Sequence, residues 1–320
     1  MYPSREVLTL KTEKVLEYLR TEQERGSNYN RRCKLVLIGT RGSGKTTLIH
    51  LLRSRGPVTS LSTIKGTDTK KTVSTEEWIL TPQEVVQSQL DSSDDDHDRK
   101  THFQQDESQI VRFTIWDYDE RAYFAPMFVS PRSVFLYVWN MQADANLENF
   151  SYWMELVKRR APGCPVIVVG THADVKSFSS DALKDYQQFY NIKQLFEVSA
   201  KDGKNFDLLR TTIFREAANM DSVRLDLPVL SRKALEFFAS KRAQGNIFCE
   251  RSDLEKHLQG DFKDVSEIEK VLEDSSQLGL AFDFHSYLLQ SSSMITLEPK
   301  QIIECISCIF VHYSGLNFTT

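Results

Sequence analysis

Long hydrophobic runs are missing from this chain of 320 residues. No stretch approaches the roughly 20 consecutive apolar residues that cross a bilayer as a helix, which excludes that class of membrane protein. The first residues carry scattered charges among apolar side chains and lack the continuous apolar run of a signal peptide. We therefore expect no transmembrane segment and no secretory leader.

Cysteine is scarce, with five residues at positions 33, 164, 249, 305 and 308. The odd count and irregular spacing argue against a disulfide framework and fit a cytoplasmic, reducing setting. Cys305 and Cys308 have the spacing of a redox or metal-binding pair. They lie in an apolar helical stretch without a second Cys/His pair, which favours packing in a core.

Charge of one sign is not in excess, because 40 Lys and Arg stand against 44 Asp and Glu, a net charge of −4. Nothing in that balance draws the protein to nucleic acid or to an anionic membrane surface. The length predicts two domains, and the 40% apolar composition is sufficient for sizeable cores.

Apolar runs alternate with helical patterns over the first two thirds of the chain. The apolar runs predict strands at 34–38, 110–116, 134–139 and 166–169. The patterns between them predict helices at 150–160 and 206–215. This alternation is typical of an α/β fold with a mostly parallel sheet covered on both faces. Residues 82–109 interrupt it with a polar, acidic segment, which predicts a disordered insert and not a calcium loop.

The two ends of the chain have a different texture. Residues 1–30 predict an amphipathic helix followed by a polar linker. Residues 225–320 predict a smaller α+β unit resembling a winged helix, with short helices, strand candidates at 278–284 and 294–297, and a last apolar helix. From position 228 onward, 9 basic residues stand against 13 acidic ones, so this unit would repel phosphates. We expect it to contact protein and not nucleic acid.

The most specific motif runs from Gly39 to Thr46 and fits G-x-x-x-x-G-K-[ST] at every fixed position. Glycines in such a loop let backbone N–H groups surround a phosphate chain, and the following helix adds its positive end. Lys45 would neutralise the β- and γ-phosphates, and the Thr46 hydroxyl would ligate Mg²⁺. The residues predicted to hold the nucleotide here are Gly39, Thr40, Arg41, Gly42, Ser43, Gly44, Lys45, Thr46 and Thr47.

Three later positions complete a nucleotide site. Asp117 follows a predicted strand and is the candidate to hold Mg²⁺, through water. Asp174 also follows a buried strand, and its carboxylate can accept from guanine N1–H and N2–H₂, donors that adenine lacks. Ser199-Ala200-Lys201 comes after the last strand, where a backbone N–H could meet guanine O6. The sequence therefore predicts a guanine nucleotide.

These motifs carry a family resemblance. The region from Lys34 to about Ala218 resembles the Ras-like GTPase domain, called Roc, of the Roco proteins, whose base-reading motif Thr-His-x-Asp reads Thr171-His172-Ala173-Asp174 here. Residues 228–310 resemble the start of the COR domain that comes after Roc, best at Leu297-Glu298-Pro299-Lys300. The closest resemblance is to leucine-rich-repeat kinases, although the chain has no kinase signature.

The resemblance implies several properties. It implies a Ras-like P-loop GTPase domain over 31–220 and the N-terminal part of COR over 225–320. It also implies that the protein binds GTP or GDP with Mg²⁺ and that Thr171, His172 and Asp174 bind the base. From the same resemblance we expect the COR segment to contact other protein domains or a second subunit.

The second switch departs from the GTPase pattern. Its Asp-x-x-Gly motif reads Asp117-Tyr118-Asp119-Glu120, which brings a negative charge toward the γ-phosphate. Arg121 stands where many GTPases carry a water-orienting glutamine. In the first switch Thr63 is the candidate for a further Mg²⁺ ligand, with Thr67 as a competitor. Two hypotheses remain open, a slow GTPase switch using Arg121 and Thr63, and a scaffold that binds guanine nucleotide without hydrolysis.

Overall fold

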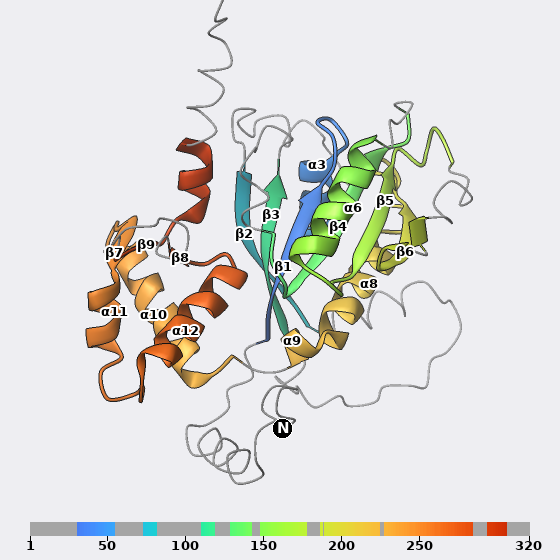
Figure 1. The fold of residues 1–320 in the computed structure, drawn as a ribbon. Helices are drawn as coiled ribbons and strands as arrows, with labels where there is room; N and C mark the ends of the chain where they lie inside the picture. The colour runs from blue at the N-terminus through green and yellow to red at the C-terminus, as the bar shows by residue number, and fades with distance from the viewer. Residues whose placement is uncertain are drawn as a thin grey trace, which may run out of the picture.

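The structure is a computed structural model, and it describes the larger part of the chain. The described residues are 31–54, 73–81, 110–118, 129–142, 148–177, 186–187, 189–224, 227–283 and 293–305. The predicted helix near the N-terminus and the predicted insert at 82–109 lie outside these residues. Figure 1 shows a central sheet with helices on both sides and a smaller group of helices beside it.

The central sheet has six strands, in the order β2-β3-β1-β4-β5-β6. Their bounds are β1 Arg31–Ile38, β2 Val73–Leu80, β3 Val111–Tyr118, β4 Ser133–Asn140, β5 Val166–Thr171 and β6 Ile192–Glu197. Every pairing is parallel except that of β2 with β3. The predicted α/β fold with a mostly parallel sheet is confirmed.

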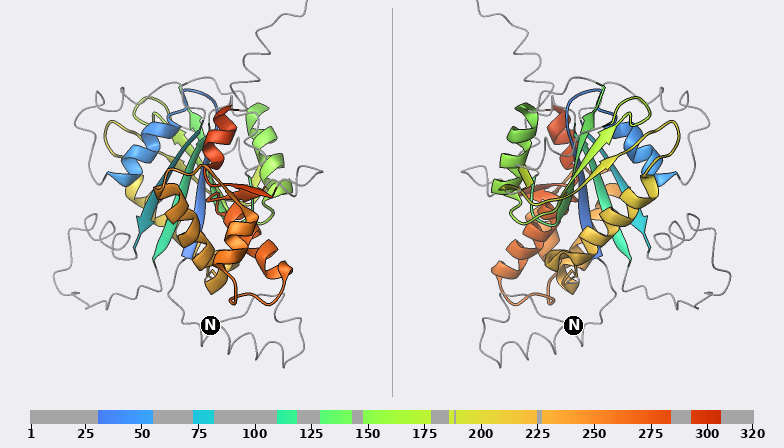
Figure 2. Two further views of the ribbon diagram at one scale, coloured as in Figure 1. Left: turned by 90° about the vertical axis from the view of Figure 1, so that its left-hand side faces the viewer. Right: turned by 90° about the vertical axis from the view of Figure 1, so that its right-hand side faces the viewer.

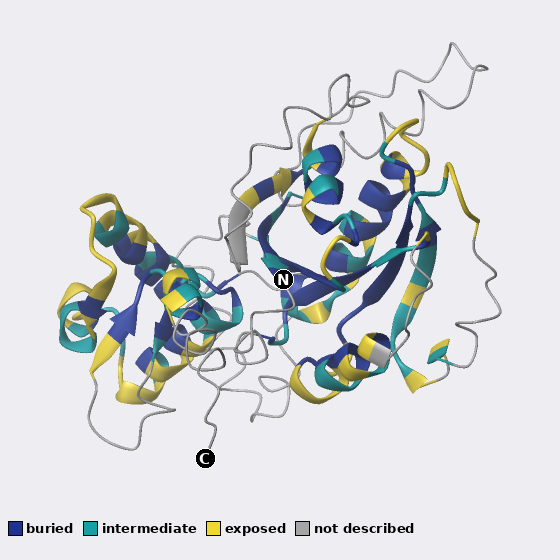
Figure 3. Ribbon diagram, turned by 90° about the horizontal axis from the view of Figure 1, so that it is seen from above, coloured by how far each residue is buried: buried dark blue, intermediate teal, exposed yellow. Residues whose placement is uncertain are grey.

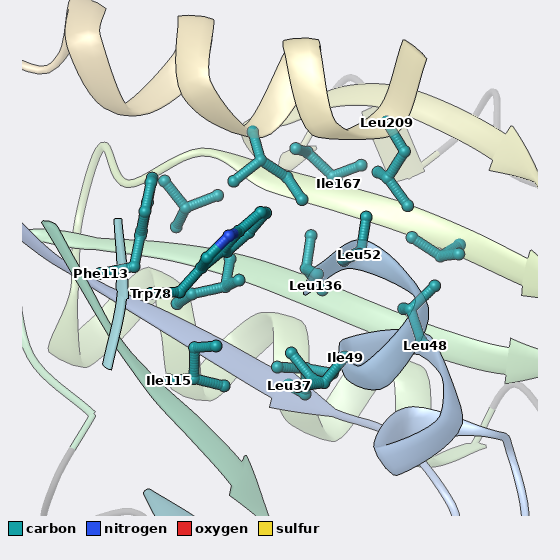
Figure 4. Packing of buried hydrophobic residues seen from close by; sticks show 14 of the residues in the cluster. Leu37, Leu48, Ile49, Leu52, Trp78, Phe113, Ile115, Leu136, Ile167 and Leu209 are labelled. Carbon is teal, nitrogen blue, oxygen red and sulfur yellow. The ribbon is translucent and has the colours of Figure 1, made fainter. Parts of the chain in front are cut away.

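Helices cover both faces of this sheet, as Figure 2 shows. On one face lie α3 (Lys45–Arg53) and α8 (Phe206–Asn219), and on the other lies α6 (Glu148–Arg160). Alternate strand residues point to opposite faces, so a strand buried on both sides is apolar along its whole length. In Figure 4, Leu48 and Leu52 of α3 pack with Leu209 of α8 over the first of these faces.

A smaller α+β unit comes after the short helix α9 (Asp221–Arg224). Its elements are α10 Val229–Ala243, β7 Phe248–Glu250, α11 Arg251–His257, α12 Val265–Gln277, β8 Phe282–Asp283 and β9 Met294–Thr296. The strands form an antiparallel sheet in the order β7-β9-β8. The unit has its own buried cluster, built from α10, α11, α12, β7, β9 and the segments that connect them.

The strand predicted at 278–284 is shorter in the structure. Helix α12 begins where the Asp264 side chain accepts from the backbone N–H groups of Ser266 and Glu267, and it continues to Gln277. Gly279 then turns the chain with φ 67°, and among the described residues 278–283 only Phe282 and Asp283 pair as a strand. A positive φ at this point prevents an extended strand.

The smaller unit packs on the α6 side of the central sheet. Phe282 and Ile303 belong to the same buried cluster as Trp116 of β3. The Ser130 hydroxyl donates to the backbone oxygen of Gln277 at 3.0 Å, and Gly279 lies against the Trp116 indole. In Figure 3 the central strands are mostly dark blue, and the exposed residues lie on outer turns of the helices and on connecting loops.

The core packing expected for Cys305 is wrong, because this side chain is exposed. Ile303 is fully buried, and two residues advance a helix by about 200°, so Cys305 lies on the opposite side. Cys308 lies outside the described residues. Within the described part of the chain, no group of three or more His, Cys, Asp or Glu could hold a metal ion, and no helix is long and apolar enough to span a membrane.

Candidate functional site

The phosphate loop connects the end of β1 to the first turn of α3. Gly39, Gly42 and Gly44 have φ of 140°, 76° and 94°, conformations that a residue with a side chain rarely adopts. A Cβ atom on Gly39 would lie 2.1 Å from the backbone oxygen of Val138. Since backbone cannot move aside easily, only glycine fits at this position of the loop.

The Lys45 side chain crosses the inside of this loop. Its Nζ donates to the backbone oxygens of Gly39 at 2.9 Å and Thr40 at 2.8 Å, and the residue is buried. Arg41 is exposed, and Thr47 is half-buried. The ammonium group is therefore held by the backbone of the loop, so a phosphate chain bound there would meet a positive charge as well as backbone N–H groups.

The two predicted metal ligands are brought together. The Thr46 hydroxyl donates to Oδ2 of Asp117 at 2.6 Å, although 71 positions separate the residues. The contact results from the topology, because β1 and β3 are parallel neighbours and their carboxyl ends meet at one edge. A hydroxyl and a carboxylate are oxygen ligands of the kind that Mg²⁺ prefers, so the pair fits this ion.

The predicted base-reading residues lie at the same edge, after β5 and β6. The Ser199 hydroxyl lies 3.3 Å from Oδ1 of Asp174, and the backbone N–H of Lys201 donates to the Ser199 hydroxyl at 3.2 Å. The backbone N–H of Ala173 donates to the oxygen of Val198 at 3.1 Å. Ala200 packs against the core below them.

A contact between the two halves of the site was not foreseen from the sequence. The Thr171 hydroxyl donates to the backbone oxygen of Ser43 in the phosphate loop, at 2.9 Å. Gly170 was also missed: a Cβ atom there would lie 2.6 Å from Sδ of Met141. A glycine inside an otherwise β-branched strand is the signal that could have indicated a close approach.

The remaining predicted residues lie outside the described part of the chain. These are Thr63 and Thr67 of the first switch and Glu120 and Arg121 of the second. Their roles stay predictions from the sequence.

A buried lysine lies behind the site on β1. Lys34 is 1% exposed, and its Nζ lies 5.8 Å from the centre of the Trp116 ring. Burial lowers the pKa of Lys34 to about 7. The neighbouring thiols of Cys33 and Cys164 are buried as well, and burial raises the pKa of Cys33 to about 12 and also raises that of Cys164. Burial of both thiols therefore disfavours the thiolate, which is the reactive form of cysteine.

Residues 79–174 match the family described as Roc, Ras of Complex, Roc, domain of DAPkinase. The match begins in β2 and ends at Asp174, so it includes Asp117 and the segment Thr171–Asp174. Relatives aligned over more than half of the chain include Roco kinases. These comparisons confirm the resemblance of the chain to Roco proteins.

Among these Roco relatives, the cyclic GMP-binding protein C of Dictyostelium discoideum is 25% identical over 321 residues, covering 95% of this chain and 12% of that protein. The leucine-rich repeat serine/threonine-protein kinase 1 of Mus musculus is 21% identical over 338 residues, covering 92% of this chain and 16% of the kinase. The chain therefore spans about an eighth of the length of the first of these relatives and about a sixth of the second.

A solved Roco structure has the same fold. The structure of Methanosarcina barkeri Roco2 RocCORdC bound to GDP superimposes with a TM-score of 0.65 and 18% identity, covering 89% of this chain and 78% of that one. Because the alignment covers 89% of this chain, it extends beyond the central sheet into the smaller unit. The expectation of a Ras-like fold is confirmed.

Proposed function

We propose that this chain binds GTP and GDP with Mg²⁺ and acts as a cytoplasmic regulatory switch in signal transduction. The observation that carries the proposal is the convergence of four distant segments at one edge of the sheet. Lys45 lies in the phosphate loop, Asp117 meets the Thr46 hydroxyl, and Asp174 meets the Ser199 hydroxyl. In that arrangement phosphate, metal and base each have a group of suitable chemistry.

The base contact gives the sharpest test. Calorimetric titration of the full chain should show binding of GDP and GTP and no binding of ADP or ATP. Asp174→Asn should weaken GDP binding by about 100-fold, because the amide can no longer accept from both guanine donors. The same variant should gain affinity for xanthosine diphosphate, whose O2 accepts from the new amide N–H.

The control for this change is Asp221→Asn, an exposed aspartate at the start of α9. It should leave GDP affinity unchanged. Binding of ADP in preference to GDP, or no nucleotide binding by the folded chain, would contradict the proposal.

Mg²⁺ would be held by Thr46 and Asp117, with Thr63 as a further ligand in the triphosphate state. The ion would neutralise charge on the β- and γ-phosphates. Chelation with EDTA should therefore weaken GTP binding, and Asp117→Asn should remove most of that Mg²⁺ dependence. An affinity independent of Mg²⁺ in the unmodified chain would contradict this part.

We propose that residues 31–220 form the Roc domain and that 225–320 form the N-terminal part of COR. The separate buried cluster of the smaller unit supports this division. The contact of that unit with Trp116, next to Asp117, supports transmission of the nucleotide state to other domains or a second subunit.

A second candidate function is a scaffold that holds guanine nucleotide without turnover. Glu120 and Arg121 favour it, since the sequence lacks the glycine and glutamine of the hydrolytic switch. A time course of GTP hydrolysis on the full chain, beside Glu120→Gly, separates the two. No phosphate release by either variant supports the scaffold, whereas release by the unmodified chain supports the slow GTPase.

A further inference from the structure

The Thr171 hydroxyl has three polar neighbours, and they restrict where protons can lie. Its Oγ1 is 2.9 Å from the backbone oxygen of Ser43, 3.2 Å from that of Trp139 and 3.0 Å from Nδ1 of His172. Thr171 is 8% exposed, so bulk water does not readily replace these partners. A Cβ atom on Gly44 would lie 3.4 Å from its Cγ2, so the side chain is also packed against the phosphate loop.

A hydroxyl group carries one proton, whereas a backbone oxygen can only accept. The Thr171 proton therefore goes to one of the two backbone oxygens, and Ser43 is the nearer. If the proton went to His172 instead, two oxygens would face Oγ1 at hydrogen-bond distance with no proton between them. The remaining neighbour, Nδ1 of His172, must then be a donor to Thr171.

We infer that His172 is a positioning residue with Nδ1 protonated, and that it fastens the base-reading segment to the phosphate loop. The hydrogen bonds run from His172 Nδ1–H to Thr171 Oγ1 and from Thr171 O–H to the Ser43 oxygen. The arrangement holds for the neutral ring and for the imidazolium, because Nδ1 carries a proton in both. Its role in nucleotide affinity rests on the proposed function.

The backbone of His172 supports this role independently. Its φ is 65°, a left-handed conformation that residues with a side chain rarely adopt. Its backbone oxygen accepts from the N–H groups of Val175 at 3.0 Å and Lys176 at 3.2 Å. Asp174 lies inside the turn that these bonds close, so fixing His172 fixes the turn that carries the base-reading carboxylate.

The first test is spectroscopic and needs no nucleotide. Long-range ¹H–¹⁵N spectra of the full chain with ¹⁵N-labelled histidine, at about pH 8 where an ordinary imidazole is neutral, report which ring nitrogen is protonated. The His172 signals are assigned by their loss in His172→Asn. We expect Nδ1–H with an unprotonated Nε2. A ring protonated at Nε2 alone would overturn the inference, whether or not the chain binds GDP.

The second test uses a matched pair of variants. His172→Asn places an N–H donor near the position of Nδ1 and tolerates a positive φ, whereas His172→Leu has a similar shape and no donor. We expect His172→Asn to keep GDP affinity within about threefold and His172→Leu to lose about tenfold or more, the loss typical of one hydrogen bond. Equal affinities for the two variants would contradict the role.

Thr171→Val removes the hydroxyl with little change of shape and closes a double-mutant cycle. In the Thr171→Val background, His172→Leu should cause a smaller loss than in the unmodified chain, because the hydrogen-bond partner is already absent and only the cost of a leucine at a positive φ remains. Fully additive losses would show that the two side chains act separately and would overturn the inference. A chain that shows Nδ1–H yet binds no guanine nucleotide would instead refute the proposed function and leave the hydrogen-bond arrangement intact.

Discussion

Gly279 lies directly against the indole of Trp116, so closely that a Cβ atom on the glycine would be 2.4 Å from Cζ2. The two residues belong to different units, Trp116 to β3 and Gly279 to the turn after α12. The smaller unit is therefore packed in direct contact with β3, the strand that carries the predicted metal ligand Asp117.

Gly279→Ala should destabilise the protein more than Gly245→Ala. Both glycines have a positive φ, 67° and 83°, so the backbone cost of alanine is similar at both. Of the two, only Gly279 has a neighbour within 4 Å. Denaturation with urea should show an additional loss of about 1–3 kcal/mol in the free energy of unfolding for Gly279→Ala. Trp116→Leu should reduce that additional loss, and equal losses for the two alanine variants would contradict the packing.

Arg210→Met should cost about 2–4 kcal/mol of stability, because it leaves a buried backbone oxygen without its donor. Arg210 is 5% exposed, and its Nε and Nη2 both donate to the oxygen of Leu52 at the end of α3. Arg215→Met on the same helix is the control, since its side chain is 53% exposed and it should change stability by less than about 0.5 kcal/mol. Similar losses would refute a special role for Arg210.

Lys34→Met should change how stability depends on pH. Burial holds the pKa of Lys34 at about 7 in the folded chain, whereas an unfolded lysine titrates near about 10.4. At pH values between these two pKa values, the unfolded chain binds more protons than the folded chain. The contribution of Lys34 to the free energy of unfolding therefore rises with pH. The cost of burying the charged ammonium is fully present below about pH 7.

The measurement is urea denaturation at about pH 6.5, 8 and 9.5, spanning that window. The stability gained by Lys34→Met should be largest at the lowest pH and shrink as the pH rises. Lys193→Met, at an exposed lysine on β6, provides the baseline. A difference between Lys34→Met and the unmodified chain that does not vary with pH would contradict the prediction.

Tyr118→Phe should leave stability unchanged or raise it by about 1 kcal/mol, since the hydroxyl is buried without compensation. Within the described part of the chain, the Tyr118 hydroxyl has no hydrogen-bond partner, and the residue is 1% exposed. Burial raises its pKa well above the ordinary value. Tyr152→Phe, at a residue 56% exposed, should be neutral in thermal denaturation. A clear loss of stability in Tyr118→Phe would show that the hydroxyl does have a partner.

The sequence predicts those elements whose residues form a continuous local pattern. The strands at 134–139 and 166–169 were found because both of their faces are covered, which makes them apolar without interruption. The approach of Thr46 and Asp117 was also predictable, since parallel strands bring their carboxyl ends to one edge.

Other features depend on tertiary contacts and left little trace in the sequence. Strand β2 is not predicted because, among the described strands, it lies at the edge of the sheet beside β3 and carries polar residues such as Glu76 and Glu77. Strand β7 has three residues, too few for a periodic pattern. The hydrogen bond from Thr171 to Ser43 joins residues 128 positions apart, and no pattern of residue types predicts it.

Phe282 and Ile303 share a buried cluster with Val36 and Trp116, and this makes the nucleotide-binding portion dependent on the smaller unit. A fragment ending at Arg224 would leave Trp116 and its neighbours facing water, an aromatic surface that favours self-association. We therefore expect the two portions to unfold together, although each also has a buried cluster of its own. Solubility, nucleotide release and stability measured on the excised fragment would therefore not describe the full chain.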